Sequence, residues 1–197
     1  MIFDRGIAER LILRKMFGGL PSNYTPLVGI TIASTRFVIN DFYLTGDDTL
    51  KFSFKTDGNG NIIGCYDSND TTKSYSFYAT TSSTGKYLRY DGGTYSSYSL
   101  ANKQYDVVIS PTGSSGVITP STWEPKSFTA LVPLSIGATS PTGVATSGTS
   151  FYGPIEVVGR AKFIPCLDED NDVCYYDLYS KTAFYPDDQT KVTAITE

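Results

Sequence analysis

Short segments that alternate apolar and polar residues fill the chain from about residue 27 onward. They are rich in β-branched and aromatic side chains, which favour strands over helices. They read LVGITIA, RFVIN, LKFSFK, NIIGCYD, SYSFYAT, KYLRYD, QYDVVIS, GVIT, VPLSIGA, GPIEVVGRAKFIP and VCYYDLYS. About eleven such segments at a spacing of about ten residues are typical of an all-β sandwich or barrel.

Turn-forming residues separate these segments. Glycine, proline, asparagine and aspartate adopt the backbone conformations that tight turns need. They gather in TGDD, DGNGN, DSND, SSTG, DGG, PTGSSG, SPTG and DEDND. No long linker interrupts the pattern, so we predict one β domain over residues 21–197.

The beginning of the chain has a different pattern, with apolar residues at helical spacing. Asp4 is placed to cap a helix and the Gly18–Gly19 pair to end it. We predict a short amphipathic α-helix over about residues 4–17, within an N-terminal segment at residues 1–20. The residues predicted to make contact with a partner are Phe3, Ile7, Leu11, Ile12 and Met16.

Such a short helix is marginal in water by itself, so something must cover its apolar face. Either the protein's own sandwich or a partner subunit would serve. We favour a partner, because a β-sandwich already uses its two inner faces against each other. This predicts docking onto other proteins or a homo-oligomer.

The stretch FIPCLDEDNDVCYYDLYSKTAFYP, residues 163–186, raises the question of a metal site. Its acidic part at residues 168–172 matches the first half of a calcium loop, D-x-D-x-D. The match then fails, because Val173 stands at the turn glycine and Tyr179 at the closing glutamate. Aspartate and asparagine are also ordinary turn residues. We predict a β-hairpin without a metal, with a bound hard cation as the alternative.

Cysteine and histidine usage limits the chemistry. The chain has no histidine, which excludes Ser-His-Asp and Cys-His catalysis and zinc sites that need imidazole. Its cysteines are Cys65, Cys166 and Cys174, too few for a four-cysteine zinc site. Cys166 and Cys174 flank the acidic turn and could face each other. We expect buried thiols in a reducing cytoplasm. A disulfide between Cys166 and Cys174 is the alternative.

Charge and targeting signals narrow the partners. The net charge of −4 argues against nucleic acid. Charged residues interrupt the N-terminal segment, and no apolar run of about 18 residues occurs. We therefore expect no signal peptide, no membrane insertion and synthesis in a cytoplasm.

Carboxylates are not arranged for sugar hydrolysis, which needs two of them about 5–9 Å apart. Sandwich-fold glucanases carry E-x-D-x-E on one strand, whereas Glu156 in PIEVVG has no carboxylate two residues later. We expect no enzyme activity and no cofactor.

Tyrosines in KYLRYDGGTYSSYS are candidates for glycan binding, because their rings stack on sugars and their hydroxyls form hydrogen bonds. The alternative is ordinary packing, since tyrosine is a favoured strand residue. The candidates are Tyr87, Tyr90, Tyr95 and Tyr98.

Three parts of the chain carry a combination of short motifs. The first is LPSNYTPLVGITIASTRFVINDFYLTGDDTLKFSFK, and the middle part comprises IIGCYD, FYAT, YLRYDGG and QYDVVIS. The third is PLSIGA with FYGPIEVVGRAKFIPCLDEDNDVCYYDLYSKTAFYP. Together they resemble the concanavalin A-like lectin/glucanase (LamG-like) domains of phage and prophage structural proteins, which have a strand, "iPc", an acidic turn and "yD…s…fy" in the third part. The resemblance covers about residues 20–186.

This resemblance implies an all-β, concanavalin A-like jelly-roll sandwich of two antiparallel sheets, preceded here by the N-terminal helix. It implies a surface role and provides no catalytic or metal-binding residue. We expect a non-enzymatic virion protein of a tailed phage, a head fibre, capsid decoration or tail adhesin, made in the host bacterial cytoplasm. Its N-terminal helix would dock onto capsid or tail proteins, and its sandwich would contact host-surface glycans. The alternatives are a free carbohydrate-binding module of a secreted or cell-surface system and, third, a glycosidase.

Overall fold

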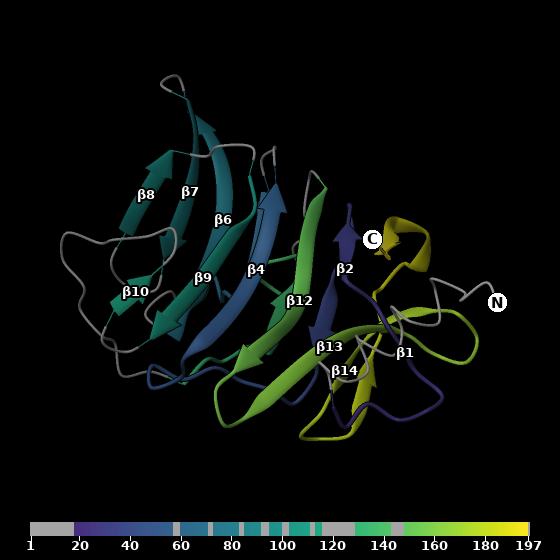
Figure 1. Ribbon diagram of the computed structural model, residues 1–197. Helices are drawn as coiled ribbons and strands as arrows, with labels where there is room; N and C mark the ends of the chain where they lie inside the picture. Colours follow the sequence, from purple (N-terminus) through teal and green to yellow (C-terminus); the bar gives the residue numbers. More distant parts are fainter. Residues whose placement is uncertain are drawn as a thin grey trace.

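The computed structural model in Figure 1 describes most of the β region. The described residues are 18–56, 60–70, 73–82, 85–91, 95–99, 103–110, 113–115, 129–142 and 148–196, of which 80–99 and 113–115 are described by their backbone alone. The helix predicted over about residues 4–17 lies outside them, as do the docking candidates Phe3, Ile7, Leu11, Ile12 and Met16.

The larger of two sheets has ten strands, and its registers are antiparallel. Its main path runs β10 (Gly113–Ser115), β9 (Tyr105–Ser110), β4 (Leu50–Thr56), β12 (Thr149–Val157), β13 (Ala161–Leu167), β14 (Val173–Asp177) and β15 (Thr182–Phe184). Off this path lie β1 (Thr25–Pro26) beside β13, β2 (Gly29–Ile32) beside β12, and β16 (Val192–Ile195) beside β2.

The smaller sheet has six strands, also antiparallel. Its order is β3 (Phe37–Ile39), β11 (Leu134–Ile136), β5 (Gly60–Cys65), β6 (Tyr75–Ser82), β7 (Gly85–Asp91) and β8 (Tyr95–Ser99). A 3₁₀ turn, η2 (Gln189–Lys191), precedes β16. No helix within the described ranges has the length and apolar character of a membrane span.

The two sheets pack face to face through aromatic side chains. Phe52 and Phe54 of β4 each meet Phe77 of β6 edge to face, with ring centroids 5.4 Å apart. Phe37 of β3 meets Tyr175 of β14 in the same geometry at 4.9 Å. One buried cluster joins residues of both sheets. The expected all-β fold with two antiparallel sheets is confirmed, and the architecture is a β-sandwich.

Alternation in the sequence explains which residues reach this core. Strand β4, LKFSFKT, buries every second residue, so the hydrophobic side chains of Leu50, Phe52 and Phe54 share one face. The segment GPIEVVGRAKFIP was predicted as one strand-like segment, but it is divided between the two strands β12 and β13. The turn between them contains Gly159 with a φ of 76°, a conformation that favours glycine.

The outer face of the larger sheet also carries a small apolar cluster. It contains the buried side chains of Cys166, Cys174 and Tyr176 from β13 and β14. Leu20 and Tyr24, which precede β1, pack against it, and the Tyr24 and Tyr176 ring centroids lie 4.7 Å apart. Leu20 and Tyr24, which lead into β1, therefore cover the outer face of the larger sheet.

Candidate functional site

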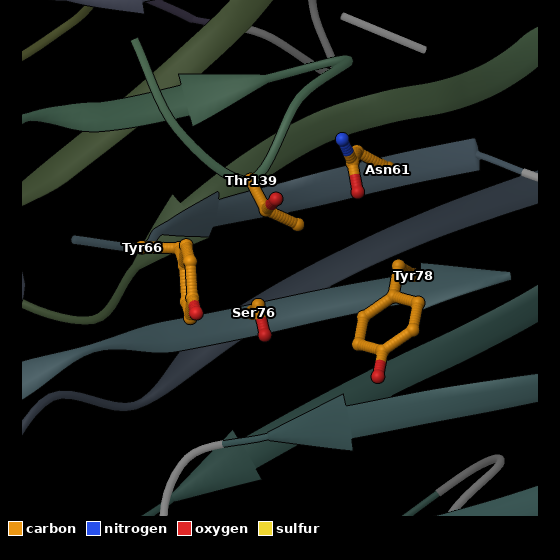
Figure 2. Close-up of a pocket in the computed structure, with 5 residues that line it drawn as sticks. All are labelled: Asn61, Tyr66, Ser76, Tyr78 and Thr139. Atoms are coloured by element: carbon orange, nitrogen blue, oxygen red, sulfur yellow. The ribbon is translucent and has the colours of Figure 1, made fainter. Parts of the chain in front are cut away.

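An open depression lies on the outer face of the six-stranded sheet. It has a volume of about 210 Å³ and is lined by Asn61, Tyr66, Ser76, Tyr78 and Thr139 (Figure 2). Side chains alternate between the two faces of a strand. Because Phe77 points into the core, its neighbours Ser76 and Tyr78 project outward. We call this feature the outer depression.

Strand register brings the polar side chains of β5 and β6 together. Asn61 pairs with Tyr78, and a bulge follows between Asn61 and Ile63. A bulge adds one residue to one strand, which re-aims the side chains on either side of it. Ile62 and Ile63 are therefore both buried, while Asn61 lies on the outer face beside Tyr78.

A close approach of backbones fixes the other end of the depression. Gly64 pairs with Ser76, and a Cβ atom on Gly64 would lie 2.5 Å from the carbonyl oxygen of Tyr75. The same atom would lie 3.1 Å from the Cα of Thr139. The Tyr66 amide donates to the Thr139 carbonyl at 2.5 Å. The glycine thus lets the segment after β11 lie against β5 and place Thr139 at the depression.

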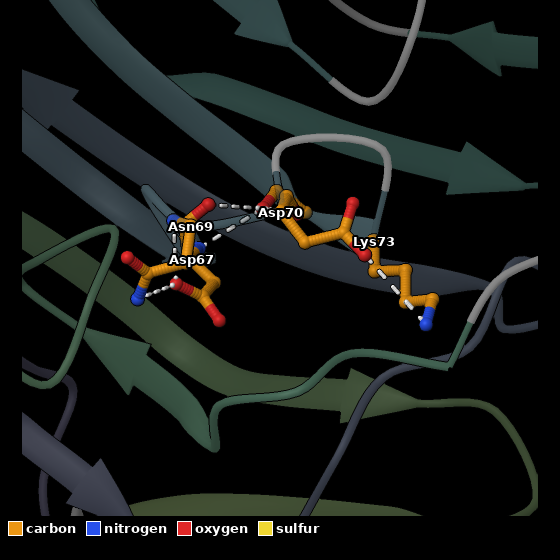
Figure 3. Close-up of polar contacts among 5 residues, drawn as sticks. Asp67, Asn69, Asp70 and Lys73 are labelled. Carbon is orange, nitrogen blue, oxygen red and sulfur yellow. Dashed lines mark hydrogen bonds and ion pairs between the residues drawn. The ribbon is translucent and has the colours of Figure 1, made fainter.

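The loop between β5 and β6 is held by its own polar groups (Figure 3). The Ser74 hydroxyl accepts from the Asp67 amide at 2.9 Å and donates to the carbonyls of Asp67 and Asp70 at 3.2 and 3.1 Å. The Asn69 backbone and side-chain amides donate to the Asp67 carboxylate. Lys73 pairs with Asp70 at 3.6 Å. These contacts fix the loop that connects Tyr66 with Ser76.

The chemistry of the outer depression suits an uncharged, hydroxyl-rich ligand. Its lining offers two phenol rings, two aliphatic hydroxyls and one carboxamide, and none of these groups is charged near neutral pH. Aromatic rings provide apolar contact, while hydroxyls and amides both donate and accept hydrogen bonds. A sugar presents both kinds of surface.

Two of the four predicted tyrosines occupy strand positions that belong to the same face of the six-stranded sheet as the outer depression. Tyr87 pairs with Thr80, and Tyr95 pairs with Asp91, which pairs with Ser76. Alternation places these positions on the outer face with Ser76 and Tyr78.

The other two tyrosines fall on the opposite face. Tyr90 pairs with Phe77, and Tyr98 pairs with Leu88, which pairs with Ala79. The side chains of all four candidates lie outside the described ones, so their role in binding stays a prediction.

Sequence reasoning missed the tyrosines that line the outer depression. Tyr78 belongs to the alternating segment SYSFYAT, where its period-two spacing from Ser76 was an available signal. Tyr66 follows β5 and had no such signal. Its place depends on the contact with Thr139, which is remote in sequence.

The acidic stretch at residues 168–172 is a hairpin turn between β13 and β14, as predicted. The Asp168 amide donates to the Asp172 carbonyl at 3.0 Å. One Asp168 carboxylate oxygen accepts from the amides of Asp170 and Asp172, and the other accepts from the Tyr185 hydroxyl at 2.8 Å. Among the residues whose side chains are described, no three His, Cys, Asp or Glu gather as metal ligands would.

The cysteines are buried. Cys166 and Cys174 are directly paired across β13 and β14, and their Sγ atoms lie 3.3 Å apart. The hydrogen bond with Cys166, together with burial, raises the pKa of the Cys174 thiol far above its ordinary value. Cys65 lies separately in the core, where burial raises its pKa to about 12.

Comparison with known proteins does not identify a family. No protein-family model matches the chain, and no curated protein matches it in sequence.

Proposed function

We propose that this chain is a non-enzymatic structural protein of a tailed-phage virion, a head fibre, capsid decoration protein or tail adhesin. Its sandwich is of the concanavalin A-like jelly-roll type and displays a binding surface for host-surface glycans. The outer depression on β5 and β6 is the centre of that surface. The N-terminal segment at residues 1–20 docks the domain onto other virion proteins or joins copies of the chain.

The observation that carries the glycan proposal is the composition of the outer depression. Tyr66 and Tyr78 provide rings, and Asn61, Ser76 and Thr139 provide uncharged hydrogen-bonding groups within one open hollow. Such hollows favour neutral or weakly charged saccharides over peptides rich in charge.

The register supports a longer binding surface. The outer-face positions beyond Tyr78 and Ser76 hold Arg89, Tyr87 and Tyr95 on the next two strands. An oligosaccharide that extends across β6, β7 and β8 would meet these positions in turn.

The virion role is supported by two observations of a different kind. The sequence motifs resemble those of phage structural domains over about residues 20–186. In addition, the chain enters through Leu20 and Tyr24 on the outer face of the larger sheet, whereas the outer depression is on the outer face of the smaller sheet. An anchor on one side and a binding surface on the other suit a displayed domain.

A glycan array tests the binding proposal. The full chain is labelled and applied to immobilised bacterial and mammalian oligosaccharides, and positive ligands are titrated in solution. Tyr78→Ala removes one ring from the outer depression and should weaken binding by about tenfold. Tyr179→Ala is the matched control, because Tyr179 is 54% exposed and lies in the turn after β14.

Two results would overturn the binding proposal. One is the absence of any saccharide bound at millimolar concentration by the folded chain. The other is a positive saccharide whose affinity is unchanged in Tyr78→Ala or falls equally in Tyr179→Ala.

A further inference from the structure

Two thiols face each other beneath the chain's entry segment. Cys166 and Cys174 are direct partners in the β13–β14 register, and both are fully buried. Directly opposite residues of antiparallel strands have Cα atoms about 4.5–5.5 Å apart, within the range that a disulfide spans. Their sulfur atoms, 3.3 Å apart, need to approach by about 1.3 Å to bond.

The pair has a defined cover. Leu20 and Tyr24 pack on it from the segment before β1, and Pro26 of β1 is the register partner of Cys166. The Tyr24 ring packs on the Tyr176 ring, with centroids 4.7 Å apart. The entry segment, which we define as residues 18–26, is thus fastened across the thiols.

We propose that Cys166 and Cys174 form a cross-strand disulfide when the protein meets a low-molecular-weight disulfide oxidant, and that the entry segment controls the rate of this step. Cys65 takes no part, because it lies in the other sheet and in the core between the sheets. The thiol pair lies on the outer face of the larger sheet, so its oxidation is independent of glycan binding at the outer depression.

The reaction is a pair of thiol–disulfide exchanges. One protein thiolate attacks a sulfur of the oxidant, which forms a mixed disulfide and releases one small thiol. The second protein thiolate then attacks the protein sulfur of that mixed disulfide and releases the second small thiol. Two protein S–H bonds become one S–S bond, while the oxidant is reduced to two thiols that take up the two protons.

Burial makes the entry segment the control point. Both thiols have no exposed surface, and the thiolate is the form that reacts. The raised pKa of Cys174 keeps this thiol protonated in the closed state. Of the four described side chains packed on the cluster, Leu20 and Tyr24 belong to the entry segment, and Leu178 and Ala183 follow β14. Lifting of residues 18–26 from β13 and β14 would therefore open the pair to the oxidant.

The experiment follows the intact mass of the full chain carrying Cys65→Ser, incubated with glutathione disulfide. The expected result is a loss of about 2 Da without added glutathione, and a peptide that links residues 166 and 174 after unreduced proteolysis. This variant leaves the pair untouched, so the outcome does not depend on the folding of a mutated pair.

Two variants test whether the entry segment controls the rate of disulfide formation. Tyr24→Ala should speed disulfide formation by about tenfold, because it removes the ring packed on Tyr176 and favours opening. Tyr179→Ala, an exposed tyrosine of the following turn, should leave the rate unchanged.

The disulfide proposal is overturned if the Cys65→Ser chain keeps both thiols after equilibration with the oxidant, or gains glutathione on one thiol without forming the cross-link. The control by the entry segment is overturned if Tyr24→Ala and Tyr179→Ala react at the wild-type rate.

Discussion

Asp177 at the end of β14 shows how one buried side chain holds two separate segments of the backbone. The residue is 3% exposed, and its carboxylate accepts from the amides of Lys162, Tyr179 and Ser180 at 2.8, 3.2 and 2.9 Å. In the sequence this aspartate belongs to VCYYDLYS, which was predicted as a strand. Its bond to the remote Lys162 amide could not be predicted, because it depends on the register of β13 and β14.

Replacing Asp177 with alanine should lower the free energy of unfolding by about 2–4 kcal/mol, because buried amides lose their acceptor. Asp170→Ala is the control, since Asp170 is exposed and should cost less than about 0.5 kcal/mol. Urea denaturation measures both. Equal losses in the two variants would contradict the structural role of Asp177.

The buried Cys65 thiol makes the free energy of unfolding depend on pH in the alkaline range. Burial raises its pKa from 9.0 to about 12, so the folded state keeps the proton that the unfolded state releases. The contribution of the protonated Cys65 thiol to the free energy of unfolding is fully present below about pH 9. It is lost as the pH rises from about 9 to about 12, and the free energy of unfolding then falls by at most about 1.4 kcal/mol per pH unit.

The measurement is the free energy of unfolding between pH 7 and 11 for the wild type and Cys65→Ala. The variant should lose stability less steeply above pH 9, because it lacks this titrating group. Parallel curves for the two proteins would show that Cys65 does not titrate as its burial requires.

At the scale of elements, alternation and turn residues were sufficient to predict many of the strands and the β13–β14 hairpin. They were not sufficient for the outer depression. The bulge after Asn61 and the contact between Tyr66 and Thr139 both depend on strands that meet only in the folded sheet. Local sequence contains no measure of such long-range pairing, which explains why Tyr66 was missed.

Gly64 links strand packing to the outer depression. A methyl group there would clash with the Tyr75 carbonyl and crowd Thr139, so Gly64→Ala should cost about 1–3 kcal/mol and weaken saccharide binding. Gly148→Ala is the matched control, because among the described residues its Cβ would meet the Thr31 methyl, at an ordinary 3.8 Å. Thermal unfolding and solution titration report both effects. Equal stability of the two variants would refute the close approach at Gly64.

At the scale of the whole molecule, the sandwich has two outer faces with different features. The entry segment covers the thiol pair on the larger sheet, and the outer depression opens on the smaller sheet. The residues that the structure describes form this sandwich with a core shared by both sheets. The docking role proposed for residues 1–20 is separate from the folding of this sandwich.

Deleting residues 1–18 should therefore leave the sandwich folded but abolish its incorporation into phage particles. Leu20 and Tyr24 remain in this variant and keep their contacts with β13 and β14. Near-ultraviolet circular dichroism verifies folding, and quantitative mass spectrometry of purified particles measures incorporation. Normal incorporation of the truncated protein would defeat the docking proposal and favour a free carbohydrate-binding module.

The most direct test of the account is a map of backbone amide chemical shifts during titration with a panel of oligosaccharides. The predicted result is a saturable set of changes at Asn61, Tyr66, Ser76, Tyr78 and Thr139, with β13 and β14 unchanged. Changes confined to the turn at residues 168–172, or none for any saccharide, would contradict the claim that the outer depression binds glycans.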